Sequence, residues 1–166
     1  MNAYEISKLV EKTKKEQSLI STIDVNDFFK YLENENHTYL ENKTFKTIAE
    51  DILNELYCMN SVPKNEIPLI CNKLNEYFLI KDINEFRKSH YIRYIKKGES
   101  KLYTGGVLVN LYSNDENTLY ARLIIFGKKF INIKIDEYVF FQKLTADEKI
   151  ILLSFDYIEQ FDENNH

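Results

Sequence analysis

The residues with the clearest chemical potential in this sequence are cations and aromatic rings gathered in its middle third. One group of cations, interleaved with Tyr91 and Tyr94, consists of Arg87, Lys88, Arg93, Lys96, Lys97 and Lys101. A second group, around a glycine, combines basic and aromatic residues: Tyr120, Arg122, Phe126, Lys128, Lys129, Phe130 and Lys134. Since cations neutralise phosphates and flat rings stack on bases, this combination is typical of a nucleic-acid-binding surface.

Nine residues of these groups are our candidates for contact with nucleic acid: Arg93, Lys96, Lys97, Lys101, Tyr120, Arg122, Lys128, Lys129 and Lys134. Two other interpretations stay open, in which the basic surface docks a protein or only faces solvent. A third use of the rings, an aromatic cage for a methylated lysine, would need three of them to converge with an acid. The rings considered for such a cage are Tyr91, Tyr94, Tyr103, Tyr112 and Tyr120.

The charge of the chain is unevenly distributed. The net charge is −4 overall, yet residues 86–134 carry 10 Lys and Arg against 3 Asp and Glu, a net of +7. Residues 1–85 have a net charge of −5, and residues 135–166 have a net charge of −6. A basic middle between acidic flanks bears on the choice of partners rather than on the fold.

No other constellation indicates catalysis or metal binding. His37, His90 and His166 are dispersed, and the spacing of Cys58 and Cys71 fits no zinc motif. The carboxylates of the first half lie on expected polar helix faces or caps, and nothing marks two of them as an acid–base pair. The sequence therefore predicts no catalytic residue, no metal and no cofactor, and a protein that is not an enzyme.

Apolar periodicity divides the chain into a helical half and a strand-rich half. Helical spacing recurs over residues 25–32, 45–56 and 67–78, with Asp24 and Thr44 as expected N-caps, Pro68 in a first turn and a weaker pattern over 4–20. The segment 82–85, DINE, resembles a capping box. From about residue 90 the period becomes two, and a last helix is expected after Thr145.

Two glycine sites shape the expected strands. We expect Gly105 and Gly106 to permit a bend or bulge in a long strand, since no Cβ obstructs it there. Around Gly127, the faces favour a three-residue loop, Gly127–Lys129, that sets Phe126 beside Phe130. This register would pair the apolar side chains Ile125 with Ile131, Leu123 with Ile133 and Ala121 with Ile135.

Five short antiparallel strands in this half predict an α+β fold. It consists of an N-terminal helical region (1–88) packed on a small five-stranded barrel (89–143), followed by a C-terminal helix and tail (144–166). The segment from Tyr91 to Lys143, YIRYIKKGESKLYTGG and onward, resembles an SH3-like barrel of the Tudor and chromatin-associated kind. More loosely, it resembles small uncharacterised proteins of large DNA viruses. This resemblance implies a binding module whose usual ligands are nucleic acids or protein tails.

The leading hypothesis is therefore a non-enzymatic protein that binds DNA or RNA through its basic, aromatic barrel surface. The alternative is a structural or assembly protein of the virion type, whose barrel docks another protein. No apolar run approaches the roughly 20 residues that span a bilayer, and the N-terminal residues lack the apolar segment of a signal peptide. We thus expect no membrane partner and an intracellular protein, with a virus factory or virion as the location that the viral resemblance implies.

Overall fold

The computed structural model describes residues 35–41 and 43–164. The described residues form two compact units, one from those up to 45 together with those from 146 to 164, the other from residues 46–145. In the first unit, the 3₁₀ helix η1 (Glu35–Leu40) lies against the helix α5 (Ala146–Asn164). The expected helices over 4–20 and 25–32, with the Asp24 cap, lie outside the described residues.

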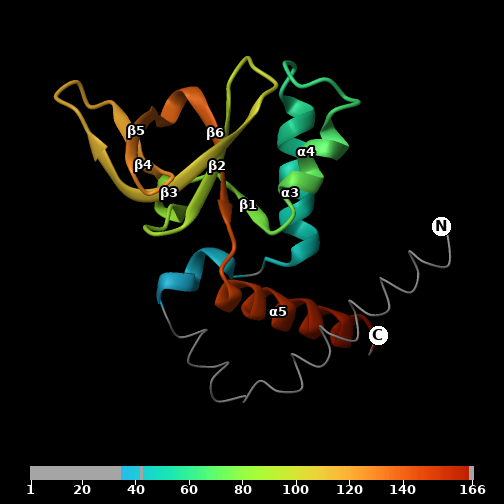
Figure 1. Cartoon of the computed structure of the whole chain (residues 1–166). Coiled ribbons are helices and arrows are strands. Elements are labelled where there is room, and N and C mark those ends of the chain that lie inside the picture. Colours follow the sequence, from blue (N-terminus) through green and yellow to red (C-terminus); the bar gives the residue numbers. More distant parts are fainter. Residues whose placement is uncertain (1–34, 42, 165–166) are drawn as a thin grey trace. The chain divides into compact units, whose positions relative to one another are not determined.

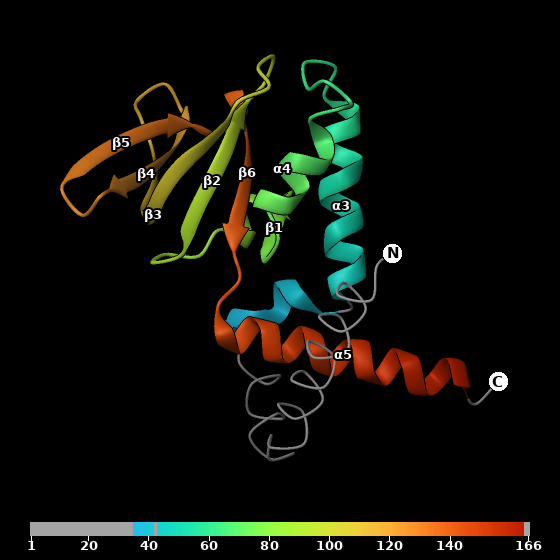
Figure 2. The ribbon, with the colours of Figure 1, turned by 45° about the vertical axis from the view of Figure 1, so that its right-hand side comes forward.

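The second unit contains two helices and one antiparallel sheet (Figures 1 and 2). The helices are α3 (Phe45–Cys58) and α4 (Ile67–Lys73), which lie beside β1 in both views. The six strands are β1 (Tyr77–Ile80), β2 (Tyr91–Lys96), β3 (Leu102–Ser113), β4 (Leu119–Ile125), β5 (Lys129–Lys134) and β6 (Tyr138–Lys143). Their spatial order is β1-β6-β2-β3-β4-β5.

The predicted closed five-stranded barrel is wrong, because the sheet is open and has six strands. The five expected strands do form, but β6 pairs with β2 on one side and with β1 on the other. The 3₁₀ helix η3 (Ile135–Glu137) links β5 to β6 without pairing them. Accordingly β1 and β5 are the two edges of the sheet, and closure does not occur.

The additional strand β1 begins within residues 67–78, where the helical spacing predicts a helix. The helix α4 ends at Lys73, and Glu76 takes a left-handed conformation with φ of 74° before the chain turns into β1. A short apolar run such as Tyr77–Ile80 fits a buried strand as well as a helix, so its period decides nothing. At its other end, the N–H groups of Lys81 and Asp82 are taken by the Glu85 carboxylate, at 2.6 and 3.1 Å.

Several local signals are confirmed. The predicted DINE capping box is present, with Asp82 as the N-cap of the 3₁₀ helix η2 (Ile83–Glu85). Pro68 lies in the first turn of α4, and α3 begins directly after Thr44. The stripe of α3 buries Ile48, Ile52 and Leu56 at a spacing of four residues.

The glycine pair produces the expected bulge in β3. Ile92 pairs with Gly106 and Tyr94 pairs with Tyr103, so β3 contains one more residue than β2 across this interval. Gly105 has a φ of 78°, and a Cβ there would lie 1.7 Å from the Ile92 carbonyl oxygen. A second irregularity follows between Leu108 and Asn110, opposite β4. With two bulges, this twelve-residue strand can bend across the sheet (Figure 1).

The β4–β5 hairpin keeps the predicted faces but not the predicted register. Ile125 pairs with Lys129, which leaves a three-residue loop that starts at Phe126, one residue earlier than expected. Phe126 and Gly127 both have positive φ, 51° and 66°, and the Lys128 N–H donates to the Ile125 carbonyl at 3.2 Å. Each strand residue is therefore shifted by two positions relative to its predicted partner, for example Leu123 to Ile131. A shift of two preserves which side chains face inward.

The inner face of the sheet holds one apolar cluster. Its buried members come from the segment before β2 and from five strands: Phe86, Ile92, Tyr94, Leu108, Ala121, Leu123, Ile133 and Phe140. Phe86 and Phe140 meet edge to face, with ring centroids 5.3 Å apart. Since β5 and β6 are four positions apart in the sheet, roughly 19 Å if it were flat, the sheet must curl for both to share this core.

Candidate nucleic-acid interface

The nine predicted contact residues fall into two groups in the structure. Arg93 and Lys96 lie on β2, and Lys97 and Lys101 lie on the turn to β3. The other five belong to the β4–β5 hairpin: Tyr120, Arg122, Lys128, Lys129 and Lys134. The predicted residues thus lie on one compact hairpin and, separately, on β2 with the turn that follows it.

The β2 group is largely engaged by the protein itself. The half-buried Arg93 donates from Nη1 to the Lys73 carbonyl at 3.1 Å and from Nε to the Tyr103 carbonyl at 3.4 Å. Lys96 lies 3.8 Å from a carboxylate oxygen of Glu99. The Lys101 ammonium lies 4.8 Å from the centroid of the Tyr103 ring. Arg93 therefore serves the fold, and the charge of Lys96 is partly neutralised.

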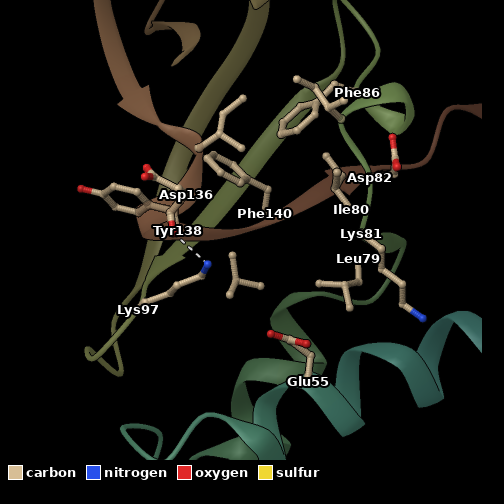
Figure 3. Close-up of a pocket in the computed structure, with 13 residues that line it drawn as sticks. Glu55, Leu79, Ile80, Lys81, Asp82, Phe86, Lys97, Asp136, Tyr138 and Phe140 are labelled. Carbon is tan, nitrogen blue, oxygen red and sulfur yellow. Dashed lines mark hydrogen bonds between the residues drawn. The ribbon is translucent and has the colours of Figure 1, made fainter. Parts of the chain in front are cut away.

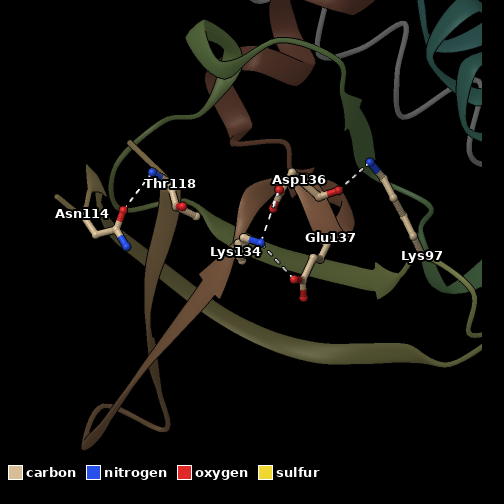
Figure 4. Close-up of polar contacts among 6 residues, drawn as sticks. All are labelled: Lys97, Asn114, Thr118, Lys134, Asp136 and Glu137. Atoms are coloured by element: carbon tan, nitrogen blue, oxygen red, sulfur yellow. Dashed lines mark hydrogen bonds and ion pairs between the residues drawn. The ribbon is translucent and has the colours of Figure 1, made fainter. Parts of the chain in front are cut away.

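Two further predicted cations, Lys97 and Lys134, meet at η3 (Figure 4). Lys97 donates from Nζ to the Asp136 carbonyl at 2.8 Å and from its backbone to the Glu137 carbonyl at 2.9 Å. The Lys134 Nζ lies 3.2 Å from Glu137 and 3.6 Å from Asp136. The hydrogen bond to Glu137 and the charge of Asp136 raise the pKa of the Lys134 amine. Lys134 is thus a cation already paired within its own chain.

The register of β3, β4 and β5 places nine side chains on the outer face of the sheet, in three rows across the strands. We call this surface the hairpin face, and its rows are Val107–Ile124–Phe130, Asn110–Arg122–Asn132 and Tyr112–Tyr120–Lys134. Each of these residues is exposed or half-buried. Their inward-facing neighbours Ala121, Leu123 and Ile133 are buried in the core. The hairpin face is therefore accessible to solvent. Its first row is apolar, its second row is polar, and its third row is aromatic and cationic.

Within the hairpin face, the central side chains hold one another in place. The Tyr112 and Tyr120 rings stack with centroids 5.4 Å apart and planes 18° apart. Arg122 lies over the Tyr112 ring at 5.0 Å and donates from Nε to the side-chain oxygen Oδ1 of Asn132 at 3.0 Å. Its partners are neutral, so no carboxylate among the described residues offsets the charge of Arg122. Tyr94 and Tyr103, two other rings considered for a cage, stack separately at 5.1 Å.

The end of the hairpin projects the most exposed aromatic rings of the described chain. Phe126 is 89% exposed and Phe130 is 58% exposed. Lys128 and Lys129, between them, are exposed, and their side chains make no hydrogen bond or ion pair with the described residues. We call Phe126, Lys128, Lys129 and Phe130 the hairpin tip. The sequence places both phenylalanines beside the lysines, but alternation alone could not tell that they stay outside the core.

A pocket of about 460 Å³ lies elsewhere in the same unit, beyond the end of β1 (Figure 3). Ile80, Phe86 and Phe140 give it an apolar wall, and its rim carries charged groups from Glu55, Lys81, Asp82, Lys97 and Asp136. Lys81 pairs with Asp51 at 2.7 Å, and Lys97 bonds to the Asp136 carbonyl. Of the predicted contact residues, only Lys97 reaches this pocket.

Neither the described residues nor the comparisons with known proteins add a further assignment. No three His, Cys, Asp or Glu side chains in the described ranges are grouped to hold a metal ion. No helix in that part of the chain is long and apolar enough to cross a membrane. No family model, curated protein or solved structure matches the chain. The resemblance to SH3-like and viral proteins therefore stays a prediction.

Proposed function

We propose that this protein is a non-enzymatic nucleic-acid-binding protein that contacts its ligand through the hairpin face and the hairpin tip. The observation that carries the proposal is one hairpin with two exposed phenyl rings and three cations, Arg122, Lys128 and Lys129, that have no carboxylate partner among the described residues. Cations would meet phosphates, while rings would meet bases. An intracellular site of action accords with such a ligand.

Contacts within the chain reduce the salt dependence that we expect for nucleic-acid binding. Phosphate contacts by all eight predicted cations on a duplex would give a slope of log K against log salt near −7, at about −0.9 per contact. Three uncommitted cations predict only about −2.7 for a duplex, or about −2.1 for a single strand at about −0.7 per contact. A shallow slope is thus expected, because Arg93, Lys96, Lys97 and Lys134 are engaged within the chain and Lys101 lies outside the hairpin.

The test is a titration of fluorescently labelled single- and double-stranded DNA and RNA, at about 50 and about 200 mM salt. A triple variant, Arg122→Glu, Lys128→Glu and Lys129→Glu, should abolish measurable binding while keeping the circular dichroism spectrum. Its control carries the same change of net charge on exposed lysines elsewhere in the second unit: Lys46→Glu, Lys64→Glu and Lys143→Glu. Equal losses in both triple variants would reduce the effect to net charge and contradict the assigned site.

Protein docking is the second candidate, and one observation favours it. The strand β5 is an open edge of the sheet, next to the apolar row Val107–Ile124–Phe130. An unpaired edge of this kind can accept an extended segment of another chain. If none of the four polymers binds at micromolar protein, the nucleic-acid proposal is refuted and an assembly role gains.

A further inference from the structure

We infer that the ligand is single-stranded nucleic acid and that Phe126 and Phe130 stack on its unpaired bases. This inference rests on the proposed function. It goes beyond that function by stating that the ligand is single-stranded and by naming the residues that contact its bases. The feature that decides between single strand and duplex is which aromatic rings contact no other ring or cation of the described residues.

Most rings near the sheet already have a partner. Phe86 contacts Phe140, Tyr94 contacts Tyr103 and Tyr138, and Tyr112 contacts Tyr120 and Arg122. Within the described residues, neither Phe126 nor Phe130 contacts another ring or a cation. Because stacking needs an uncovered ring face, the tip phenylalanines suit external stacking better than the tyrosines of the hairpin face do.

The backbone conformation of Phe126 also supports a role for this residue in ligand contact. Its φ of 51° lies in the left-handed region, which a bulky side chain rarely adopts and which Gly or Asn would occupy more readily. This position thus combines a disfavoured backbone conformation with an almost fully exposed phenyl ring. Such residues concentrate at sites of ligand contact, where folding stability alone does not explain the residue type.

The charges around these rings complement a nucleic-acid backbone. Lys128 and Lys129 lie between the two phenylalanines in sequence, and Arg122 lies in the row next to that of Phe130. In a duplex, each base face is covered by its neighbours, so a ring can reach it only after unstacking. In a single strand the faces are open, and stacking then adds affinity with little dependence on sequence. Three cations with two open rings therefore fit a short single strand.

The experiment measures fluorescence anisotropy of a labelled oligothymidylate, an oligouridylate and a duplex of equal length with the full chain. We expect the unaltered protein to prefer the single strands. Phe126→Ala and Phe130→Ala should each weaken single-strand binding about 5- to 150-fold, which corresponds to about 1–3 kcal/mol per stacked base. Duplex binding should change less than twofold. The two single-stranded probes distinguish DNA from RNA as the preferred ligand.

Four further variants separate ring stacking from apolar contact and from a loss of folding. Phe126→Tyr keeps a ring and should retain most of the affinity of the unaltered protein. Phe126→Leu keeps apolar area without a ring and should lose affinity as Phe126→Ala does. Tyr57→Ala, at a 55% exposed ring of α3, is the matched control and should bind as the unaltered chain does. Phe126→Gly relieves the backbone, so it should fold at least as stably while still losing affinity.

The possible failures are distinguishable. If the unaltered chain binds single strands and the double variant Phe126→Ala, Phe130→Ala binds them equally well, the inference is overturned and the proposed function stands. Binding of duplex as tightly as single strands also overturns it. If the unaltered chain binds no probe, the proposed function falls and the inference falls with it.

Discussion

Replacing Gly105 by alanine tests the most specific structural claim about this fold, namely that the bulge in β3 has no room for a side chain. The added Cβ would lie 1.7 Å from the Ile92 carbonyl oxygen and 2.8 Å from its carbonyl carbon. Both atoms belong to the backbone of the neighbouring strand, so no side-chain rotation can relieve the overlap. Instead, β2 and β3 would have to separate where Ile92 is fully buried.

The expected cost has two parts. Alanine at a φ of 78° loses about 1–2 kcal/mol through its left-handed backbone alone. Strand separation would break about two hydrogen bonds worth about 1 kcal/mol each and would loosen the packing of Ile92 by about 1–2 kcal/mol. Together these give a destabilisation of roughly 4–6 kcal/mol, a large share of the roughly 5–15 kcal/mol typical of a domain.

Urea unfolding followed by far-ultraviolet circular dichroism measures this cost. The matched control is Gly98→Ala, because Gly98 has a similar φ of 88° but nothing within 4 Å of an added Cβ. It should lose only the backbone part, about 1–2 kcal/mol. If Gly105→Ala and Gly98→Ala lower the unfolding free energy equally, the bulge tolerates a side chain and the reasoning is refuted.

Three further predictions concern polar contacts near the sheet. Gln142 is fully buried, accepts from the Arg87 N–H at 2.8 Å and donates to the Glu85 carbonyl at 3.4 Å. Gln142→Met should lower the free energy of unfolding in urea by about 1–3 kcal/mol. A loss under about 0.5 kcal/mol would contradict this prediction. Glu85→Ala removes the acceptor of two N–H groups after β1 and should cost about 1 kcal/mol by the same measurement, whereas an unchanged midpoint would deny the capping box a role. The hydrogen bond from the Tyr103 hydroxyl to Glu99, at 2.9 Å, is the main cause that raises the pKa of Tyr103 above its ordinary 10.0. Its stabilising effect is therefore full below about pH 10 and declines as pH rises through the higher folded-state pKa; ¹³C-tyrosine NMR should show Glu99→Gln moving this titration to lower pH, and an unmoved titration would contradict the assignment.

Local signals in the sequence determined the strands from Tyr91 to Lys143, the bulge at Gly105 and the capping box at Asp82. Each depends on the few residues around it: alternation sets the faces of a strand, glycine admits positive φ, and Asp and Glu three apart cap a helix turn. The same alternation placed Tyr120, Arg122 and Lys134 on one face. A two-residue error in the hairpin register did not disturb this, because the side-chain period is two.

Only the tertiary structure decided how the sheet ends and which charges stay available. The pairing of β1 with β6 joins residues 60 to 66 positions apart, from Ile80 with Phe140 to Tyr77 with Lys143, and no local rule reports such a contact. The neutralisation of Lys134 depends on the turn at η3, and the engagement of Arg93 depends on the end of α4. Composition fixed the number of positive groups; their usable number depends on where the fold places carboxylates and carbonyls, because electrostatic interactions act through space rather than along the sequence.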